Sequence, residues 1–179
     1  MSKKYGGQKN VIYEICNEPN GNVTWNKQIK PYAKTIVKTI RKHSKNAVIV
    51  IGTPTWSQDV DVVAQSPLKG KNLMYALHFY AGTHKEWNQE KLKTAHKKGL
   101  PVMVTEFSIC DASGNGALDK ASGNQWLRLL DRYNISYTAW SLCNKNESSA
   151  LIASTCSKTS GWTNGDLSAA GKWYFNKTK

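Results

Sequence analysis

Several features are scarce or missing in this chain of 179 residues. No apolar run approaches the roughly 20 residues of a membrane-spanning helix, and the N-terminal residues lack the apolar stretch of a signal peptide. The four cysteines (Cys16, Cys110, Cys143 and Cys156) include no Cys-x-x-Cys pair, which disfavours a zinc site. No glycine-rich phosphate loop follows any strand-like run, which disfavours a nucleotide-binding sheet. We therefore expect no membrane partner, no metal and no organic cofactor.

Acidic residues are also scarce, since 12 Asp and Glu stand against 25 Lys and Arg, for a net charge of +13. Such a balance raises the question of nucleic-acid binding. No basic-aromatic motif accompanies the lysines. They recur every three or four residues, as on a solvated helix face, for example at Lys27, Lys30, Lys34, Lys38 and Lys42. We expect no specific nucleic-acid partner, whereas attraction to acidic polysaccharide or another anionic surface follows from the charge alone.

Aromatic residues are plentiful, with seven Trp, eight Tyr and three Phe, and they indicate a folded protein. The length suits one domain with a real core, so the whole chain, 1–179, is predicted to be a single domain. Cys143 and Cys156 bracket a loop rich in Ser, Thr and Asn, and are candidates for a disulfide. Spacing alone leaves three pairing schemes open. We expect a secreted, extracellular protein.

Strand-like and helix-like runs alternate along the chain. The strand-like runs are 10–17, 47–53, 73–80, 101–107 and 135–142, and the helix-like runs are 28–44, 59–65, 87–98, 120–134 and 169–176. Apolar strands alternating with helices predict βαβ units and a parallel sheet, hence an α/β fold. Polar and aromatic residues gather at the carboxyl ends of these strands, where both barrels and open α/β sheets place active sites.

Two carboxylates stand at such strand ends, Glu18 after the first strand and Glu106 in the fourth. Strand alternation predicts that Glu14, Cys16 and Glu18 share one side. A pair of acids suits glycoside hydrolysis, in which one protonates the leaving oxygen and the other attacks or activates water. Taken alone, Glu18 is equally well explained as a solvated loop acid, and Glu106 is slightly better explained as a buried, paired structural acid. Their sequence spacing does not predict their separation, so the stereochemistry stays open.

Several motifs in order resemble glycoside hydrolase family five, and most closely its bacterial-type endo-β-1,4-glucanases (cellulases). The resemblance runs from about Tyr5 to Trp173. It is carried by Asn17-Glu18-Pro19, Thr105-Glu106, Ile29-Lys30-Pro31-Tyr32-Ala33, Gly52-Thr53, Thr55-Trp56-Ser57-Gln58-Asp59, 74–83, 111–116 and Lys145-Asn146-Glu147-Ser148-Ser149.

The resemblance implies a retaining hydrolase of β-glucan that needs no cofactor. Glu18 corresponds to the general acid/base and Glu106 to the nucleophile, while Asn17 corresponds to the residue that binds the sugar 2-hydroxyl. Together they would cleave internal β-1,4 bonds of cellulose-type polysaccharide.

The same resemblance implies a sugar-binding cleft. Tyr80 corresponds to a tyrosine at the nucleophile, His78 to its neighbouring histidine and Trp140 to a sugar platform. The cleft would also be lined by Trp56, His84, Lys145 and Glu147. Without the resemblance, a lone His or Trp on a strand is more often a core residue, and Lys145 with Glu147 a surface ion pair.

This chain also departs from the family pattern. By motif order its five strands correspond to strands four to eight of an eight-stranded (β/α) barrel, so a partial TIM barrel is predicted, without the Arg and His of strands one to three. Phe107 stands where many relatives have Trp. Open sheet edges favour association, so we expect a homo-oligomer that completes the barrel. The alternative is a non-catalytic glucan-binding remnant or an inactive truncated fragment.

Overall fold

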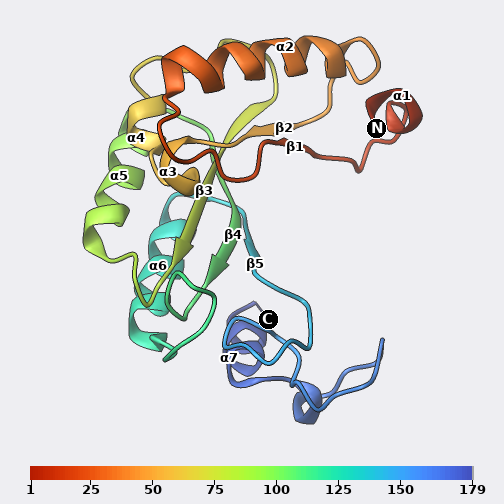
Figure 1. Cartoon of the computed structure of the whole chain (residues 1–179), viewed down its shortest axis with the longest axis vertical. Coiled ribbons are helices and arrows are strands. Elements are labelled where there is room, and N and C mark those ends of the chain that lie inside the picture. The colour runs from red at the N-terminus through yellow and green to blue at the C-terminus, as the bar shows by residue number, and fades with distance from the viewer. Residues whose placement is uncertain (179) are drawn as a thin grey trace. The chain divides into compact units, whose positions relative to one another are not determined.

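The fold is a parallel α/β sheet with intervening helices, seen in a computed structural model that describes residues 1–178 (Figure 1). The strands follow one another in the order β1-β2-β3-β4-β5. β1 pairs with β2, β2 with β3 and β4 with β5, all in parallel. The strands are β1 (Tyr13–Ile15), β2 (Ile49–Ile51), β3 (Leu73–Tyr80), β4 (Val102–Ser108) and β5 (Tyr137–Ala139). The predicted α/β class and parallel pairing are confirmed.

Each predicted helix is present, and shorter turns accompany them. The helical elements are α1 (Ser2–Tyr5), the π-helical turn η1 (Trp25–Ile29), α2 (Lys30–Arg41), α3 (Pro54–Ser57), α4 (Val60–Val63), α5 (Glu86–Lys97), α6 (Lys120–Arg132), the 3-10 turn η2 (Asn164–Asp166) and α7 (Ala169–Lys177). Across residues 1–178, no helix has the length and apolar character to cross a membrane.

β1 is shorter than the predicted run 10–17, because Cys16 leaves the extended conformation with φ of +64°. A left-handed residue interrupts the alternation of side chains along a strand. Strand alternation, the reason given for placing Glu14, Cys16 and Glu18 on one side, therefore ends at Ile15, although Glu14 and Glu18 both approach His78. The strand predicted at 135–142 is likewise reduced to the three residues of β5.

The chain forms two compact units, and each unit consists of two separate stretches of the sequence. The first unit comprises residues 1–78 and 90–103, and the second comprises residues 79–89 and 104–179. The changes of unit fall inside β3, α5 and β4 rather than in linkers. Each unit has its own apolar core.

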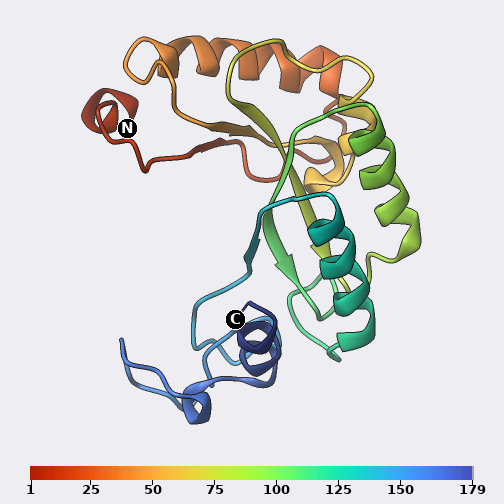
Figure 2. The ribbon, with the colours of Figure 1, turned by 180° about the vertical axis from the view of Figure 1, so that it is seen from behind.

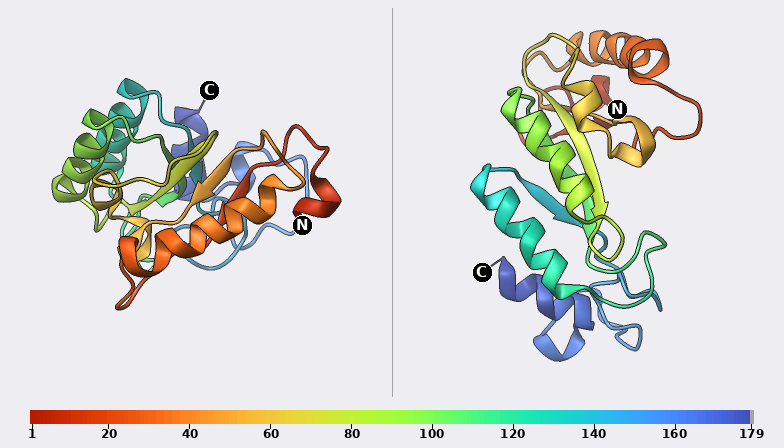
Figure 3. Two further views of the ribbon diagram at one scale, coloured as in Figure 1. Left: turned by 90° about the horizontal axis from the view of Figure 1, so that it is seen from above. Right: turned by 90° about the vertical axis from the view of Figure 1, so that its left-hand side faces the viewer.

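In the first unit, α2 lies alongside β1 and β2 (Figures 1 and 3). Its apolar side packs inward through Ala33 and Ile40, while every residue of β2 is fully buried. Arg41 closes the end of this helix, where its guanidinium donates to the carbonyl oxygens of Ser44, Ala47 and Lys71 at 3.1, 2.8 and 2.6 Å. These bonds tie the helix end to the segments that enter β2 and β3.

In the second unit, aromatic rings form the centre of the core. Trp126 of α6 is fully buried and stacks on Phe79, with ring centroids 4.0 Å apart. Phe79 in turn stacks on Phe107 of β4 at 5.1 Å. Figure 2 shows α6 beside this part of the sheet. Phe107, at the position where many relatives carry Trp, is thus a core residue here.

All four cysteines are free thiols. Cys156 donates to Asp166 Oδ1 at 3.7 Å, and Cys143 Sγ lies 3.2 Å from Ser141 Oγ. The suggested Cys143–Cys156 disulfide is therefore not formed, and the loop is closed by other bonds. One of them is the bond from Asn144 Nδ2 to the Cys156 carbonyl oxygen, at 2.9 Å.

Trp126 should be the most costly aromatic side chain to remove from the second unit. We expect Trp126→Ala to lower the free energy of unfolding by about 3–5 kcal/mol in urea titrations, because it empties a fully buried, stacked site. Trp162→Ala is the control, since this side chain is 37% exposed. Equal effects of the two substitutions would contradict the assigned core.

Candidate functional site

The predicted site residues divide between the two units. Asn17, Glu18, Trp56 and His78 belong to the first, and Tyr80, His84, Glu106, Trp140, Lys145 and Glu147 to the second. Within each unit one catalytic candidate is bonded to a side chain of β3. The two sets are therefore described in turn.

In the first unit, Glu18 is held by a buried histidine. Its Oε1 lies 2.8 Å from Nδ1 of His78, whose side chain is only 2% exposed. On the other side of the ring, Nε2 of His78 lies 3.9 Å from Glu14 Oε1. The imidazole thus lies between two carboxylates. A buried ring needs such partners for its nitrogens, so β3 itself restricts where Glu18 can lie.

The loop after β2 is bonded to the turn that carries Glu18. Ser57 Oγ donates to the Asn17 carbonyl oxygen at 2.7 Å and accepts from the Thr53 amide at 3.2 Å, while the Trp56 amide donates to the Pro19 carbonyl oxygen at 3.0 Å. These bonds hold Thr55, Trp56 and Ser57 in the left-handed region, at φ of 57°, 55° and 56°. Three consecutive left-handed residues without glycine are costly, and such strain concentrates at functional sites.

This loop presents an aromatic surface next to the predicted acid. The Trp56 side chain is 49% exposed although its backbone is bonded to the Asn17–Pro19 turn. Asn17 is exposed, and Glu18 is partly buried. The structure therefore brings Trp56, Asn17 and Glu18 together, as the resemblance implies. Sequence reasoning missed Ser57 as the residue that joins them, and Glu14 as the second acid at His78.

The Glu18–His78 pair is a hydrogen bond rather than the start of a metal site. A zinc ion would lie about 2.0–2.2 Å from each ligand atom. With 2.8 Å between Nδ1 and Oε1, these two atoms are in direct contact, and an ion would have to separate them.

In the second unit, Glu106 is buried and bonded to a tyrosine. Its side chain is 7% exposed, and Tyr80 Oη donates to its Oε1 at 2.7 Å. Tyr80 is fixed at its backbone, since its amide donates to Nδ1 of His84 at 2.7 Å. The His84 carbonyl oxygen accepts from Trp126 Nε1 at 2.8 Å. His84 is itself only 6% exposed, so in this structure it supports the Tyr80–Glu106 pair from within.

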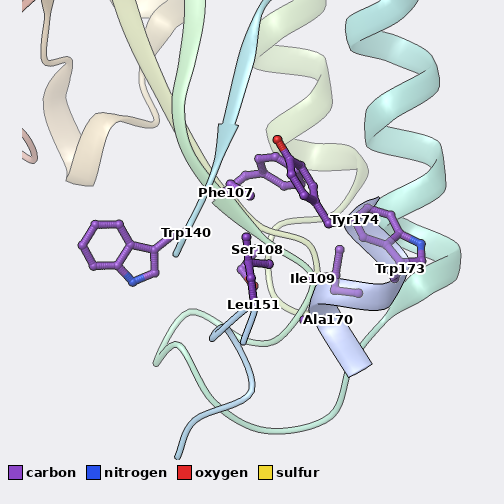
Figure 4. A pocket seen from close by; sticks show the side chains of 9 residues that line it. Phe107, Ser108, Ile109, Trp140, Leu151, Ala170, Trp173 and Tyr174 are labelled. Carbon is purple, nitrogen blue, oxygen red and sulfur yellow. The ribbon is translucent and has the colours of Figure 1, made fainter. Parts of the chain in front are cut away.

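Trp140 follows β5 and is 46% exposed. The Trp140 amide donates to the Phe107 carbonyl oxygen at 2.8 Å. Phe107 is the residue after Glu106 in β4, so this bond holds Trp140 beside the end of that strand. Figure 4 shows its indole lying apart from the rings of Phe107 and Tyr174. The pocket lined by these residues has a volume of only about 10 Å³, room for no more than one water. This pocket is therefore too small for a ligand larger than water.

Lys145 and Glu147 form an ion pair at 3.3 Å, with Lys145 71% and Glu147 23% exposed. Glu147 Oε1 also accepts from Ser149 Oγ at 3.1 Å. The neighbouring Ser148 amide donates to Asn115 Oδ1 at 3.2 Å, which joins this loop to the loop after β4. The pair is thus attached to the loop that follows Glu106, although the exposed ammonium makes it weak as a source of stability.

A second ion pair joins the loops that follow β3 and β4. Lys85 Nζ lies 2.6 Å from Asp119 Oδ2, and Asp119 also caps α6 by accepting from the Ser122 amide at 2.8 Å. The hydrogen bond from Lys85, followed by that from Ser122, holds the pKa of the Asp119 carboxyl below its ordinary value. Sequence reasoning missed this pair, because its members lie 34 residues apart.

Comparisons of this chain with known proteins agree on one protein family. Residues 1–146 match the sequence profile of Cellulase (glycosyl hydrolase family 5). An endoglucanase of Clostridium saccharobutylicum is 48% identical over 96% of this chain and 38% of its own length. Endoglucanase 5 of Pectobacterium carotovorum is 45% identical over 97% of this chain and 34% of its own length. The chain therefore spans little more than a third of these curated relatives.

Solved structures agree on the fold. A structure from Cytophaga hutchinsonii has 41% identity and a TM-score of 0.95, over 99% of this chain and 58% of the other. The catalytic domain of a Thermobifida fusca endoglucanase, described as a complex with cellotetraose, has 33% identity and a TM-score of 0.91, over 98% of this chain and 59% of the other. The predicted partial TIM barrel of five strands is confirmed by these neighbours.

The lowered pKa of Asp119 predicts a pH-dependent contribution to stability. A carboxyl whose folded pKa lies below its ordinary value of 3.8 stabilises the fold above that pH, and the contribution is lost as the pH falls through the folded pKa. Asparagine also caps helices well, so Asp119→Asn removes mainly the ion pair.

We expect Asp119→Asn to cost up to about 1 kcal/mol at pH 6, since the pair is partly exposed, and the difference to shrink below about pH 4. Urea unfolding across this pH range measures it, and a double-mutant cycle with Lys85→Gln isolates the pair. If the difference in unfolding free energy between wild type and Asp119→Asn does not change with pH, the ion pair is not its cause.

Proposed function

This chain belongs to the cellulases of glycosyl hydrolase family 5, and from that membership we propose that it hydrolyses internal β-1,4-glucosidic bonds of cellulose-type polysaccharide. The observation that carries the proposal is the pairing of each candidate carboxylate with a side chain of β3. His78 binds Glu18 at 2.8 Å and Tyr80 binds Glu106 at 2.7 Å. Each carboxylate thus has a bonded partner within its own unit.

In the proposed retaining mechanism, Glu106 attacks the anomeric carbon while Glu18 donates its proton to the glycosidic oxygen, so that the bond to the leaving sugar breaks. Water then attacks the same carbon, Glu18 takes the proton of that water, and the bond between sugar and Glu106 breaks. In this proposal buried Tyr80 holds Glu106 through its hydrogen bond, and exposed Asn17 binds the 2-hydroxyl. The exposed faces of Trp56 and Trp140 suit the apolar faces of pyranose rings.

A non-catalytic role is the second candidate. It is favoured by length, because the chain spans only 38% and 34% of the two curated endoglucanases named above. In that case the exposed tryptophans would hold glucan without turnover. Either role is proposed to operate outside the cell, where polymeric glucan is found.

Loss of either carboxylate should abolish turnover. We expect Glu18→Gln and Glu106→Gln to lower the release of reducing sugar from hydroxyethylcellulose by about 10²-fold or more, since each removes a proton donor or nucleophile. Glu90→Gln, an exposed acid on α5, is the control. Proton NMR that identifies the anomer formed first tests whether hydrolysis retains the configuration of the anomeric carbon.

The outcomes separate the candidates. If the wild-type chain binds cellotetraose in calorimetry but releases no sugar, the non-catalytic role holds. If wild type and both variants release sugar equally, the proposed roles of Glu18 and Glu106 are wrong.

We also propose that a second copy of this chain covers the open edge of β1. Among the described residues β1 is the end strand of the sheet, and a cavity of about 560 Å³ lies against it, lined by Tyr5, Val11, Ile12, Ile36 and Ile40 among others. Ile12 is 53% exposed. An open strand edge flanked by apolar side chains favours strand addition, and a second copy offers further strands of the same kind.

Light scattering after size-exclusion chromatography tests this association. We expect a concentration-dependent dimer or larger species that Ile12→Lys converts to monomer. Val62→Lys is the matched control, since Val62 of α4 is a 44% exposed apolar residue away from this edge. A monomer at every concentration, or equal behaviour of both variants, would refute the proposal.

A further inference from the structure

The positive charge of this chain is concentrated in the first unit. That unit holds 16 of the 25 Lys and Arg residues and five of the 12 Asp and Glu residues, whereas the second holds nine and seven. The excess is strongest in residues 19–58, which contain seven Lys and Arg and no acid at all. Within these 40 residues no carboxylate is available to pair with the cations.

Four of these lysines form a stripe on α2 and its two ends. Lys27 lies in η1, Lys34 and Lys38 in α2, and Lys42 caps the helix; all four are exposed. Lys34, Lys38 and Lys42 follow one another at intervals of four residues, which span about 6 Å along one face of a helix, and Lys27 lies seven residues before Lys34, about two turns earlier. None of the ion pairs in the described part of the chain involves them. We call these four residues the lysine stripe.

The lysine stripe does not serve the stability of its helix. Like charges four residues apart repel each other, at a cost of about 0.2–0.5 kcal/mol per pair. The first turn of α2 also carries no acid to complement the positive end of the helix dipole. A polyanion lying along the stripe would remove this repulsion, so charge complementarity identifies the kind of partner.

The stripe contains Lys and no Arg, so it attracts anions as a row of point charges and offers no bidentate fork. No basic-aromatic motif of the kind that binds nucleic acid accompanies it, which leaves an acidic polysaccharide as the polyanion to test. Arg41, the sole Arg of the first unit, spends its donors on three backbone carbonyl oxygens. Ala33 and Ile40 of α2 are buried, so the side of the helix that carries the stripe is separate from its buried apolar side.

We propose that the lysine stripe is a docking surface for an acidic polysaccharide, a sugar chain with a carboxylate on successive residues. The proposal rests on the glucanase function proposed above, because it places the enzyme on an anionic polymer mixed with its neutral substrate. The attraction is electrostatic and long-ranged, and salt weakens it.

Retention on immobilised polygalacturonate tests the proposal without requiring turnover. The Glu106→Gln chain serves as the background, so a failure of catalysis leaves the result readable. We expect retention at low salt and a loss of affinity of about tenfold or more in Lys34→Gln/Lys38→Gln/Lys42→Gln. Lys120→Gln/Lys172→Gln/Lys177→Gln removes the same charge from exposed positions of the second unit and should keep the affinity.

If the two triple variants elute at the same salt concentration, the proposal is overturned, because net charge alone would then explain the binding. Tighter binding to duplex DNA or to vesicles of anionic phospholipid than to polygalacturonate, at equal anion concentration, would also overturn it. Circular dichroism of each variant verifies that α2 remains folded. Hydrolysis of neutral hydroxyethylcellulose, measured separately on the chain with Glu106 intact, reports on the proposed function alone.

Discussion

The site depends on the burial of β3. All but one of its eight residues are buried, including the polar side chains His78 and Tyr80 near its carboxyl end. A buried polar group without a partner costs about 1–3 kcal/mol, so each of these side chains requires one. They find Glu18 and Glu106. β3 therefore supplies the bonded partner of Glu18 in the first unit and that of Glu106 in the second.

Hydrogen bonds between side chains and backbone join the loops beyond the strands. Ser57 joins the Trp56 loop to the Asn17 turn, and Asn115 joins the loop after β4 to Ser148. Such bonds keep Trp56 exposed while preventing its loop from moving freely. Exposed aromatic rings on restrained backbone are well suited to a long, flat ligand, since little further ordering is needed on binding.

The two units differ in what stabilises them. The second has a stacked aromatic core around Phe79 and Trp126 and a nearly balanced charge. The first has an aliphatic core around β2 and a large excess of Lys, which it holds at exposed positions. Charge of one sign opposes compactness, so the first unit has the larger electrostatic cost of folding.

Sequence alone determined the order of strands and helices, the α/β class and the motifs around Glu18 and Glu106, because these follow from local periodicity and adjacent residues. It could not determine that β1 ends at Ile15, since the left-handed Cys16 is imposed by the turn it enters. Tertiary structure alone decided that His78 is the partner of Glu18 and that Cys143 and Cys156 are free thiols, whereas the contact between Tyr80 and Glu106 was already implied by the family resemblance. These are distances between residues far apart in the chain, and only folding brings such residues within bonding range.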